Sequence, residues 1–265
     1  MINRYLVSIF LAVPLALVAA DKPDLTEEQA REVITKFAAK EAEFAKAREV
    51  YTYRQSVKTQ EYDSNGRPGG KYELVSDIIF SGDGKRTERI VRAPANTLKE
   101  ITLSPEDEQD LRNVQPFVLT TKDVDLYHVR YLGRETLDEI TCFAFAVKPK
   151  KLEQGKRYFQ GIVWVDDKDL QIVKSYGRAT GLLKKGTDQQ FPKFETYREQ
   201  IDGKFWFPTF TTANDTLQFQ TNSVKIKMTV RYEDYKQFKG QSTVIFGDVV
   251  ENKPTDKAPP VPPKK

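Results

Sequence analysis

Few side chains in this sequence of 265 residues can carry out covalent chemistry, because it has one histidine, His128, and one cysteine, Cys142. A serine-hydrolase triad would need His128 as its general base, but His128 lies in an alternating run that predicts a strand, and no Gly-x-Ser-x-Gly nucleophile elbow is present. A Cys–His pair would need the fold to bring these two residues together. Cys142 is more simply explained as a small buried apolar residue. We therefore expect no catalytic residues and no enzymatic activity.

Acidic and glycine-rich segments offer two further candidates for ligand chemistry. Three aspartates carry carboxylate oxygens of the kind that coordinate calcium, namely Asp166, Asp167 and Asp169. They lie between two apolar runs, however, where aspartate is an ordinary turn residue. The segment 66–71 is the nearest approach to a phosphate loop, but its spacing and the Tyr72 that follows do not fit. One cysteine and one histidine also exclude a Cys/His zinc cluster. We expect neither a metal nor a cofactor.

The charge of the chain is concentrated at its two ends. The formal net charge is +4, and Arg4 together with the lysine-rich tail accounts for the whole surplus, so the body from 21 to 251 is neutral. A neutral body lacks the dense basic surface that binding to a phosphate backbone needs, so we expect no nucleic-acid partner. The basic tail is the part suited to transient contact with an anionic membrane surface.

The first twenty residues have the three parts of a secretory signal peptide. A basic start that includes Arg4 precedes an apolar run from Tyr5 to Val18, and small residues follow at Ala19 and Ala20. We expect cleavage after Ala20 and export of the mature chain to the periplasm. The apolar run is shorter than the ~20 residues that a membrane-spanning helix needs.

Two helices are expected in the mature chain. Thr26 and Gln29 form a capping-box pattern, and apolar residues then recur at helical spacing, so we predict an amphipathic helix from Thr26 to Arg48. Ser104 followed by Pro105 is a strong helix start, which predicts a short inserted helix from Ser104 to Asn113.

From Tyr51 to Phe246 the apolar period changes to two, which indicates β-strands. Tight-turn signals such as Asn65-Gly66, Asp83-Gly84 and Asp202-Gly203 separate the runs and predict antiparallel hairpins. We therefore predict a mainly antiparallel α+β fold, a curled half-open barrel of about 10–11 strands covered by the two helices. A single domain is expected over residues 21–251, followed by a disordered Pro/Lys-rich tail over 252–265.

This combination resembles the LolA/LolB-like superfamily of periplasmic lipoprotein-sorting proteins. The likeness is carried by the strand-turn-strand segment Gly161–Val173 (GIVWVDDKDLQIV) and by Phe194–Pro208 (FETYREQIDGKFWFP). The resemblance implies a half-open barrel with an apolar concave face and helical lids, in which acyl chains of a lipoprotein or another lipid lie. The arginine that closes the lid in that family has no clear counterpart in this sequence.

The expected function is therefore that of a monomeric periplasmic carrier whose partner is a lipid or an acylated lipoprotein. The residues expected to contact this ligand are large apolar side chains on the helix, the strands and one loop: Phe37, Tyr53, Phe80, Trp164, Leu182, Leu183 and Met228. The alternative is a non-enzymatic binding or scaffold module whose apolar faces form a filled core without lipid. Alternation of apolar and polar residues predicts a cavity wall and a core face equally well.

The segment 181–186 (GLLKKG) allows two interpretations. In one, Leu182 or Leu183 packs into the core and the other is incidental. In the other, the segment is a loop at the cavity mouth, where both leucines touch lipid and Lys184 and Lys185 face its headgroup.

Overall fold

The computed structural model describes residues 24–80, 85–111, 115–182, 191–220 and 222–237. Its elements are α1 (Glu27–Ala47), η1 (Arg48–Val50), β1 (Tyr51–Tyr62), β2 (Pro68–Phe80), β3 (Arg86–Arg92), α2 (Pro105–Gln109), η3 (Val124–Leu126), β4 (Tyr127–Leu137), β5 (Ile140–Pro149), β6 (Tyr158–Asp166), β7 (Ile172–Thr180), β8 (Phe194–Ile201), β9 (Phe205–Gln218) and β10 (Ser223–Gln237). The expected signal peptide, the Asp83-Gly84 turn, residues 183–186 and the tail over 252–265 lie outside the described residues.

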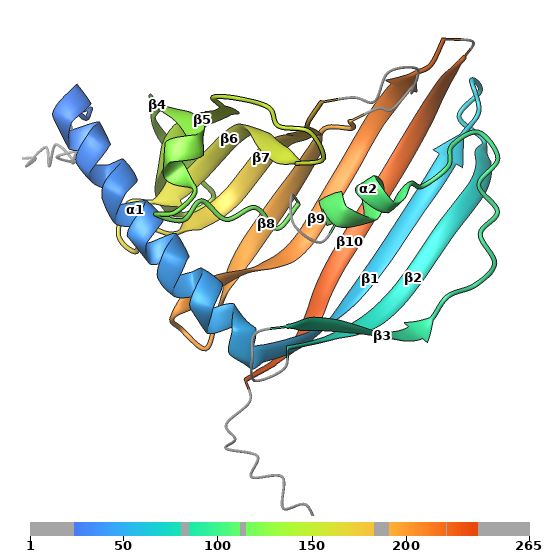
Figure 1. Ribbon diagram of the computed structural model, residues 1–265, viewed down its shortest axis with the longest axis horizontal. Helices are drawn as coiled ribbons and strands as arrows, with labels where there is room; N and C mark the ends of the chain where they lie inside the picture. Colours follow the sequence, from blue (N-terminus) through green and yellow to red (C-terminus); the bar gives the residue numbers. More distant parts are fainter. Residues whose placement is uncertain (1–23, 81–84, 112–114, 183–190, 221, 238–265) are drawn as a thin grey trace, which may run out of the picture.

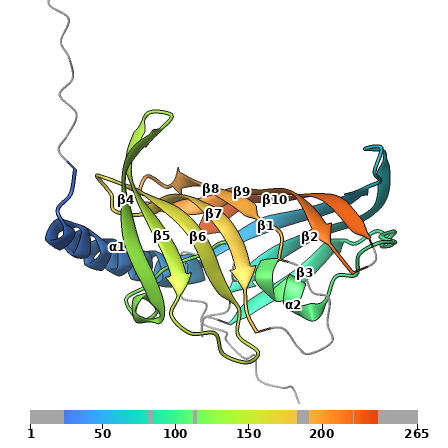
Figure 2. The same ribbon diagram turned by 90° about the horizontal axis from the view of Figure 1, so that it is seen from above.

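The strands form one ten-stranded antiparallel sheet in the order β3-β2-β1-β10-β9-β8-β7-β6-β5-β4. The sheet curls without closing, and α1 and α2 lie on its same side (Figures 1 and 2). We call this side the inner face. The predicted fold class, a mainly antiparallel curled sheet with an N-terminal helix, is confirmed. Because β1 pairs with β10, the first and last strands meet inside the sheet, while β3 and β4 are its two edges.

Local sequence explains where α1 begins. The Thr26 hydroxyl accepts from the Gln29 amide at 3.2 Å, and the Gln29 side chain accepts from the Thr26 amide at 2.9 Å, which is the predicted capping box. The helix ends at Ala47, one residue before the predicted end, and it buries Ala30, Phe37, Ala38, Glu41 and Phe44. Within the described part of the chain, no helix is both long and apolar enough to cross a membrane.

Turn chemistry sets the hairpins as predicted. Asp202 and Gly203 both have positive φ, at 56° and 66°, which is the conformation of a type I′ turn between β8 and β9. Gly66 has a φ of 76° in the turn between β1 and β2. This backbone region favours glycine because a side chain would be strained there.

The connection from β3 to β4, residues 93–126, joins the two edges of the sheet across its inner face (Figure 1). We call it the β3–β4 linker. It carries α2, which begins at Pro105 within the predicted Ser104–Asn113 helix, whose predicted end at Asn113 lies outside the described residues. Ser104 begins it as expected, because its hydroxyl accepts from the Asp107 amide at 3.1 Å.

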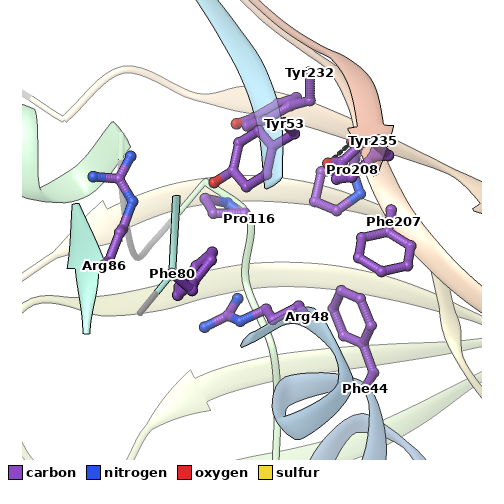
Figure 3. Close-up of a pocket in the computed structure, with 10 residues that line it drawn as sticks. All are labelled: Phe44, Arg48, Tyr53, Phe80, Arg86, Pro116, Phe207, Pro208, Tyr232 and Tyr235. Atoms are coloured by element: carbon purple, nitrogen blue, oxygen red, sulfur yellow. Dashed lines mark hydrogen bonds between the residues drawn. The ribbon is translucent and has the colours of Figure 1, made fainter. Parts of the chain in front are cut away.

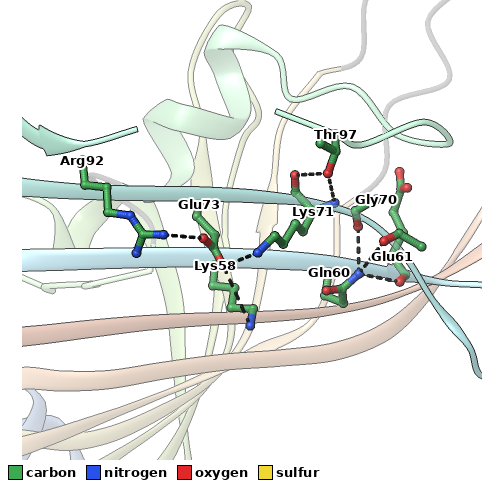
Figure 4. A network of polar contacts seen from close by, with 9 residues as sticks. Lys58, Gln60, Glu61, Gly70, Lys71, Glu73, Arg92 and Thr97 are labelled. Carbon is green, nitrogen blue, oxygen red and sulfur yellow. Dashed lines mark hydrogen bonds and ion pairs between the residues drawn. The ribbon is translucent and has the colours of Figure 1, made fainter. Parts of the chain in front are cut away.

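Buried Glu61 anchors the start of this linker on the sheet. Its carboxylate accepts from the backbone amides of Lys99 at 3.1 Å, Glu100 at 2.8 Å and Ile101 at 2.9 Å. Beside it, the Lys71 amide donates to the Thr97 hydroxyl at 2.9 Å, as Figure 4 shows. Charge-assisted bonds of this kind are stronger than neutral ones, so they hold the linker against β1 and β2.

The main core fills the half of the inner face that α1 covers. Phe37 is fully buried there, with its ring 5.3 Å from that of Phe145, and Phe117 and Leu119 of the linker close the same cluster. The outer face of these strands carries a separate small cluster, in which Cys142, Ala144, Trp164 and Val173 are buried. Alternation along β5 and β6 therefore separates two apolar layers, and the layer under α1 is packed protein.

Candidate functional site

The two residues that a nucleophilic mechanism would need lie far apart. His128 is exposed near the start of β4, whereas Cys142 is fully buried in β5 and pairs with Glu135. Seven positions along β4 separate His128 from Glu135, which is about 23 Å of extended strand. Burial raises the pKa of the Cys142 thiol to about 12, so this thiol remains protonated at neutral pH.

The three aspartates of the β6–β7 connection all have protein partners. Asp166 accepts from the backbone amides of Lys168 and Asp169, each at 3.3 Å, as a turn residue does. Arg134 donates to Asp167 at 3.2 Å, and the Asp169 carboxylate accepts from Trp206 Nε1 at 3.1 Å. Among the described residues no group of three or more His, Cys, Asp and Glu side chains is arranged to hold a metal ion.

A pocket of about 150 Å³ lies on the inner face, between the end of α1 and the β3–β4 linker (Figure 3). Its lining comes from α1, η1, the β3–β4 linker and five strands. Six of the ten described lining residues are aromatic, and the full set is Phe44, Arg48, Tyr53, Phe80, Arg86, Pro116, Phe207, Pro208, Tyr232 and Tyr235. Such a lining is apolar over most of its surface, with polar atoms at a few fixed positions.

Strand pairing brings the aromatic rings of this pocket together. Tyr53 of β1 lies 5.1 Å from Tyr235 and 6.1 Å from Tyr232 of the neighbouring β10. Phe207 of β9 lies 4.8 Å from Tyr235 and 5.1 Å from Phe44, the last buried residue of α1. Ring contacts of this kind add to the stabilisation from burial alone, so these walls are preformed.

The pocket tyrosines are neutral hydrogen-bonding groups. Burial raises the pKa of Tyr53, Tyr232 and Tyr235 above the ordinary phenol value, so all three keep their protons at neutral pH. The Tyr235 hydroxyl donates to the Pro208 carbonyl at 2.6 Å and is thereby already engaged. The aromatic walls therefore present ring surfaces and bring no negative charge to the pocket.

Two arginines give the pocket its charge. Arg86 donates to Glu88 at 3.3 Å and to the Gln55 side-chain oxygen at 3.4 Å. Arg48 follows the last residue of α1, and its guanidinium points among the rings (Figure 3). Burial lowers the pKa of Arg48, but a guanidinium stays protonated in proteins.

A buried ion pair beside the pocket holds the end of α1 in place. Glu41 is fully buried and accepts from Arg198 Nη1 at 3.1 Å through both oxygens, and from the Ile172 amide at 3.0 Å. Arg198 Nη2 also donates to the carbonyl of Phe117 in the linker, and its guanidinium lies 5.1 Å from the Phe44 ring. One pair thus joins α1, β7, β8 and the linker, and positions the pocket residue Phe44.

Of the side chains predicted to contact ligand, the fold brings Tyr53 and Phe80 together in the pocket. Phe37 and Met228 lie in the packed core under α1. Trp164 is in the outer-face cluster, where its Nε1 donates to Glu135 at 2.7 Å. Leu182 is 47% exposed, and Leu183 is outside the described residues.

Sequence reasoning missed most of the pocket lining. Phe44 and Arg48 are four positions apart at the end of the predicted helix, and this spacing indicates that they lie on the same face. Tyr232 continues the apolar alternation of β10, but Tyr235 carries no such signal, because the alternation breaks where Asp234 adopts a φ of 57°. A register shift between β1 and β10 lies opposite this point.

No family model matches the sequence, and neither does a curated protein. Solved structures do match. A DUF1329 family protein from Desulfovibrio piger is similar over 82% of this chain and 97% of its own, with 16% identity and a TM-score of 0.46. A LolA superfamily protein from Nitrosomonas europaea covers the same shares, with 11% identity and a TM-score of 0.35.

A third match is a putative outer membrane lipoprotein-sorting protein domain from Vibrio parahaemolyticus. It covers 79% of this chain and 95% of its own, with 11% identity and a TM-score of 0.36. Structures of the LolA superfamily are thus among the matches, as the sequence resemblance predicted, and the likeness is one of structure at low sequence identity.

Proposed function

We propose that this chain is a non-enzymatic binding module that shelters an apolar group, such as part of an acyl chain, in the aromatic pocket of its inner face. The observation that carries the proposal is the pocket lining itself, in which six aromatic side chains from five elements surround open space. Apolar cavities bind apolar molecules readily because they hold water poorly. A module with this site needs no catalytic residue to function.

The volume of the pocket limits what it can hold. At about 150 Å³ it is smaller than the 300–1,000 Å³ of a typical drug-sized site and matches a cavity of roughly 150 Å³ that accepts one benzene ring. We therefore propose that it receives one ring-sized group or the end segment of an acyl chain. The remainder of a longer chain would lie along the inner face, where Tyr72 and Leu74 are only half-buried.

The sequence supports a further proposal about where the protein acts and how its chain is divided. We propose that the chain is exported to the periplasm after cleavage behind Ala20, that residues 21–251 form one domain with 252–265 as a tail, and that the protein acts as a monomeric carrier of lipid or acylated lipoprotein.

A second candidate function is a scaffold module without a lipid ligand. It is favoured by the packed core around Phe37, because most of the inner face under α1 is filled by protein. The two candidates differ in one respect that can be measured, namely whether the pocket near Phe80 holds a ligand.

Detergent-free native mass spectrometry of the protein isolated from the periplasm tests this difference. We expect a bound lipid or fatty acid on the wild-type chain and its loss, by about tenfold in occupancy, from Phe80→Ala, because burying a ring-sized surface contributes roughly 1.5–3 kcal/mol. Phe210→Ala is the matched control, since Phe210 packs against Tyr197 and does not line the pocket. A ligand-free wild-type protein would favour the scaffold.

A further inference from the structure

The Arg48 guanidinium is a half-buried cation with unused hydrogen-bonding capacity. Within the described residues it makes neither a hydrogen bond nor an ion pair, although its backbone amide donates to the carbonyls of Phe44 and Lys46. A guanidinium has five N–H donors and loses much of its hydration among aromatic rings. Its position at the C-terminal end of α1 is favourable for a cation, but the guanidinium points into the pocket (Figure 3).

The carboxylates near Arg48 are committed elsewhere or face water. Glu41 is held by Arg198, Glu49 is exposed, and Glu88 pairs with Arg86. Among the ten described lining residues of the pocket, two are arginines and none is acidic. The pocket therefore combines a mostly apolar lining with the positive charge of Arg48, which no ion pair within the described residues neutralises, whereas Arg86 is paired with Glu88.

A planar guanidinium binds carboxylate and phosphate oxygens in a two-pronged geometry, and such bonds are among the strongest polar contacts in proteins. An uncharged apolar ligand would leave the donors of Arg48 without a partner, whereas an anionic head group would satisfy them. The distribution of charge and rings thus favours a ligand that has both parts.

We infer that the ligand of this pocket is an anionic amphiphile, whose carboxylate or phosphate is bound by Arg48 while its apolar part lies among Tyr53, Phe80 and Tyr235. The inference rests on the proposed function and adds the head-group chemistry to it. It assigns Arg48 as the residue that determines specificity, with Arg86 as a second cation at the same site.

Isothermal titration with probes of one chain length separates the head from the chain. Dodecanoate and dodecyl phosphate carry the anion, dodecanol carries none, and acetate and inorganic phosphate carry the anion without the chain. We expect both anionic probes to bind about tenfold or more tightly than dodecanol, as a charge-assisted hydrogen bond implies. We expect no measurable binding of acetate or inorganic phosphate, because the rings contribute the remainder.

Three variants assign the preference to Arg48. Arg48→Gln should lose the preference for the anionic probes and keep its affinity for dodecanol, whereas Arg48→Lys should retain part of the preference. Lys46→Gln also removes one positive charge, two residues earlier at an exposed position in the last turn of α1, and it should bind like the wild type. Unchanged melting temperatures in all three would show that the fold is intact.

The outcomes are distinguishable. If no probe binds, the proposed function fails with the inference. If dodecanol binds as tightly as dodecanoate, or if Arg48→Gln keeps the preference, the pocket is a binding site but the inference is wrong. If inorganic phosphate binds as tightly as dodecyl phosphate, the site recognises a small anion and the amphiphile is excluded.

Discussion

Replacing Glu41 by alanine is expected to lower the free energy of unfolding by about 3–5 kcal/mol, because it leaves the Arg198 guanidinium buried without its counter-ion. The loss is large since Glu41 also accepts from the Ile172 amide at 3.0 Å, so a buried backbone donor loses its partner as well. Burial raises the pKa of Glu41 while Arg198 opposes this, so the carboxylate depends on that pairing. Urea unfolding monitored by circular dichroism measures the change.

The control for this variant is Glu43→Ala on the same helix. Glu43 pairs with Lys40 at 3.0 Å on the exposed side, and such surface pairs contribute roughly 0–1 kcal/mol. Replacing both members of the buried pair with apolar residues, as Glu41→Leu together with Arg198→Met, should recover part of the lost stability, because the uncompensated charge is removed while the Ile172 amide still lacks its acceptor. If Glu41→Ala were no more destabilising than Glu43→Ala, the pair would not hold α1 on the sheet.

Phe37→Ala and Phe80→Ala are expected to have opposite effects on stability and binding. Phe37 is fully buried in the packed core, so its truncation should cost about 3–5 kcal/mol of stability and leave the affinity of the pocket for dodecanoate nearly unchanged. Phe80 is half-buried at the pocket, so its truncation should weaken binding about tenfold with a much smaller loss of stability.

Chemical denaturation and titration of both variants check this contrast. Phe37 was predicted from the sequence as a ligand contact alongside Phe80, and the fold places the two in different environments. Should Phe37→Ala bind dodecanoate poorly at a temperature where it is fully folded, the space under α1 would be part of the binding site and not only core.

Local elements of this fold were predictable because short-range chemistry determines them. The reciprocal bonds of Thr26 and Gln29 start α1 where the capping pattern predicts, and Asp202-Gly203 turns the chain between β8 and β9. Antiparallel pairing of sequential strands followed from the same turns. The number of strands was predicted from their alternation, which depends only on residues two apart.

The pocket was less predictable because it depends on contacts between distant segments. Tyr53 and Tyr235 meet only because β1 pairs with β10 inside the sheet, and no turn in the sequence encodes that pairing. Trp164 shows a second limit, since both faces of β6 are apolar and alternation does not tell which one is inner. Glu41 shows a third limit, because a single carboxylate on a helix is expected to be solvent-exposed unless its partner is known, and that partner, Arg198, comes from β8.

We propose that the aromatic pocket of the inner face holds the ligand of this chain. Photolabelling with a dodecanoate that carries a diazirine at the end of its chain, followed by peptide mapping, tests that claim most directly. We expect saturable labelling of peptides that contain Tyr53, Phe80 or Tyr235, suppressed by unlabelled dodecanoate. Labelling that does not saturate, or that falls instead on the outer-face peptides around Trp164 and Trp206, would contradict it.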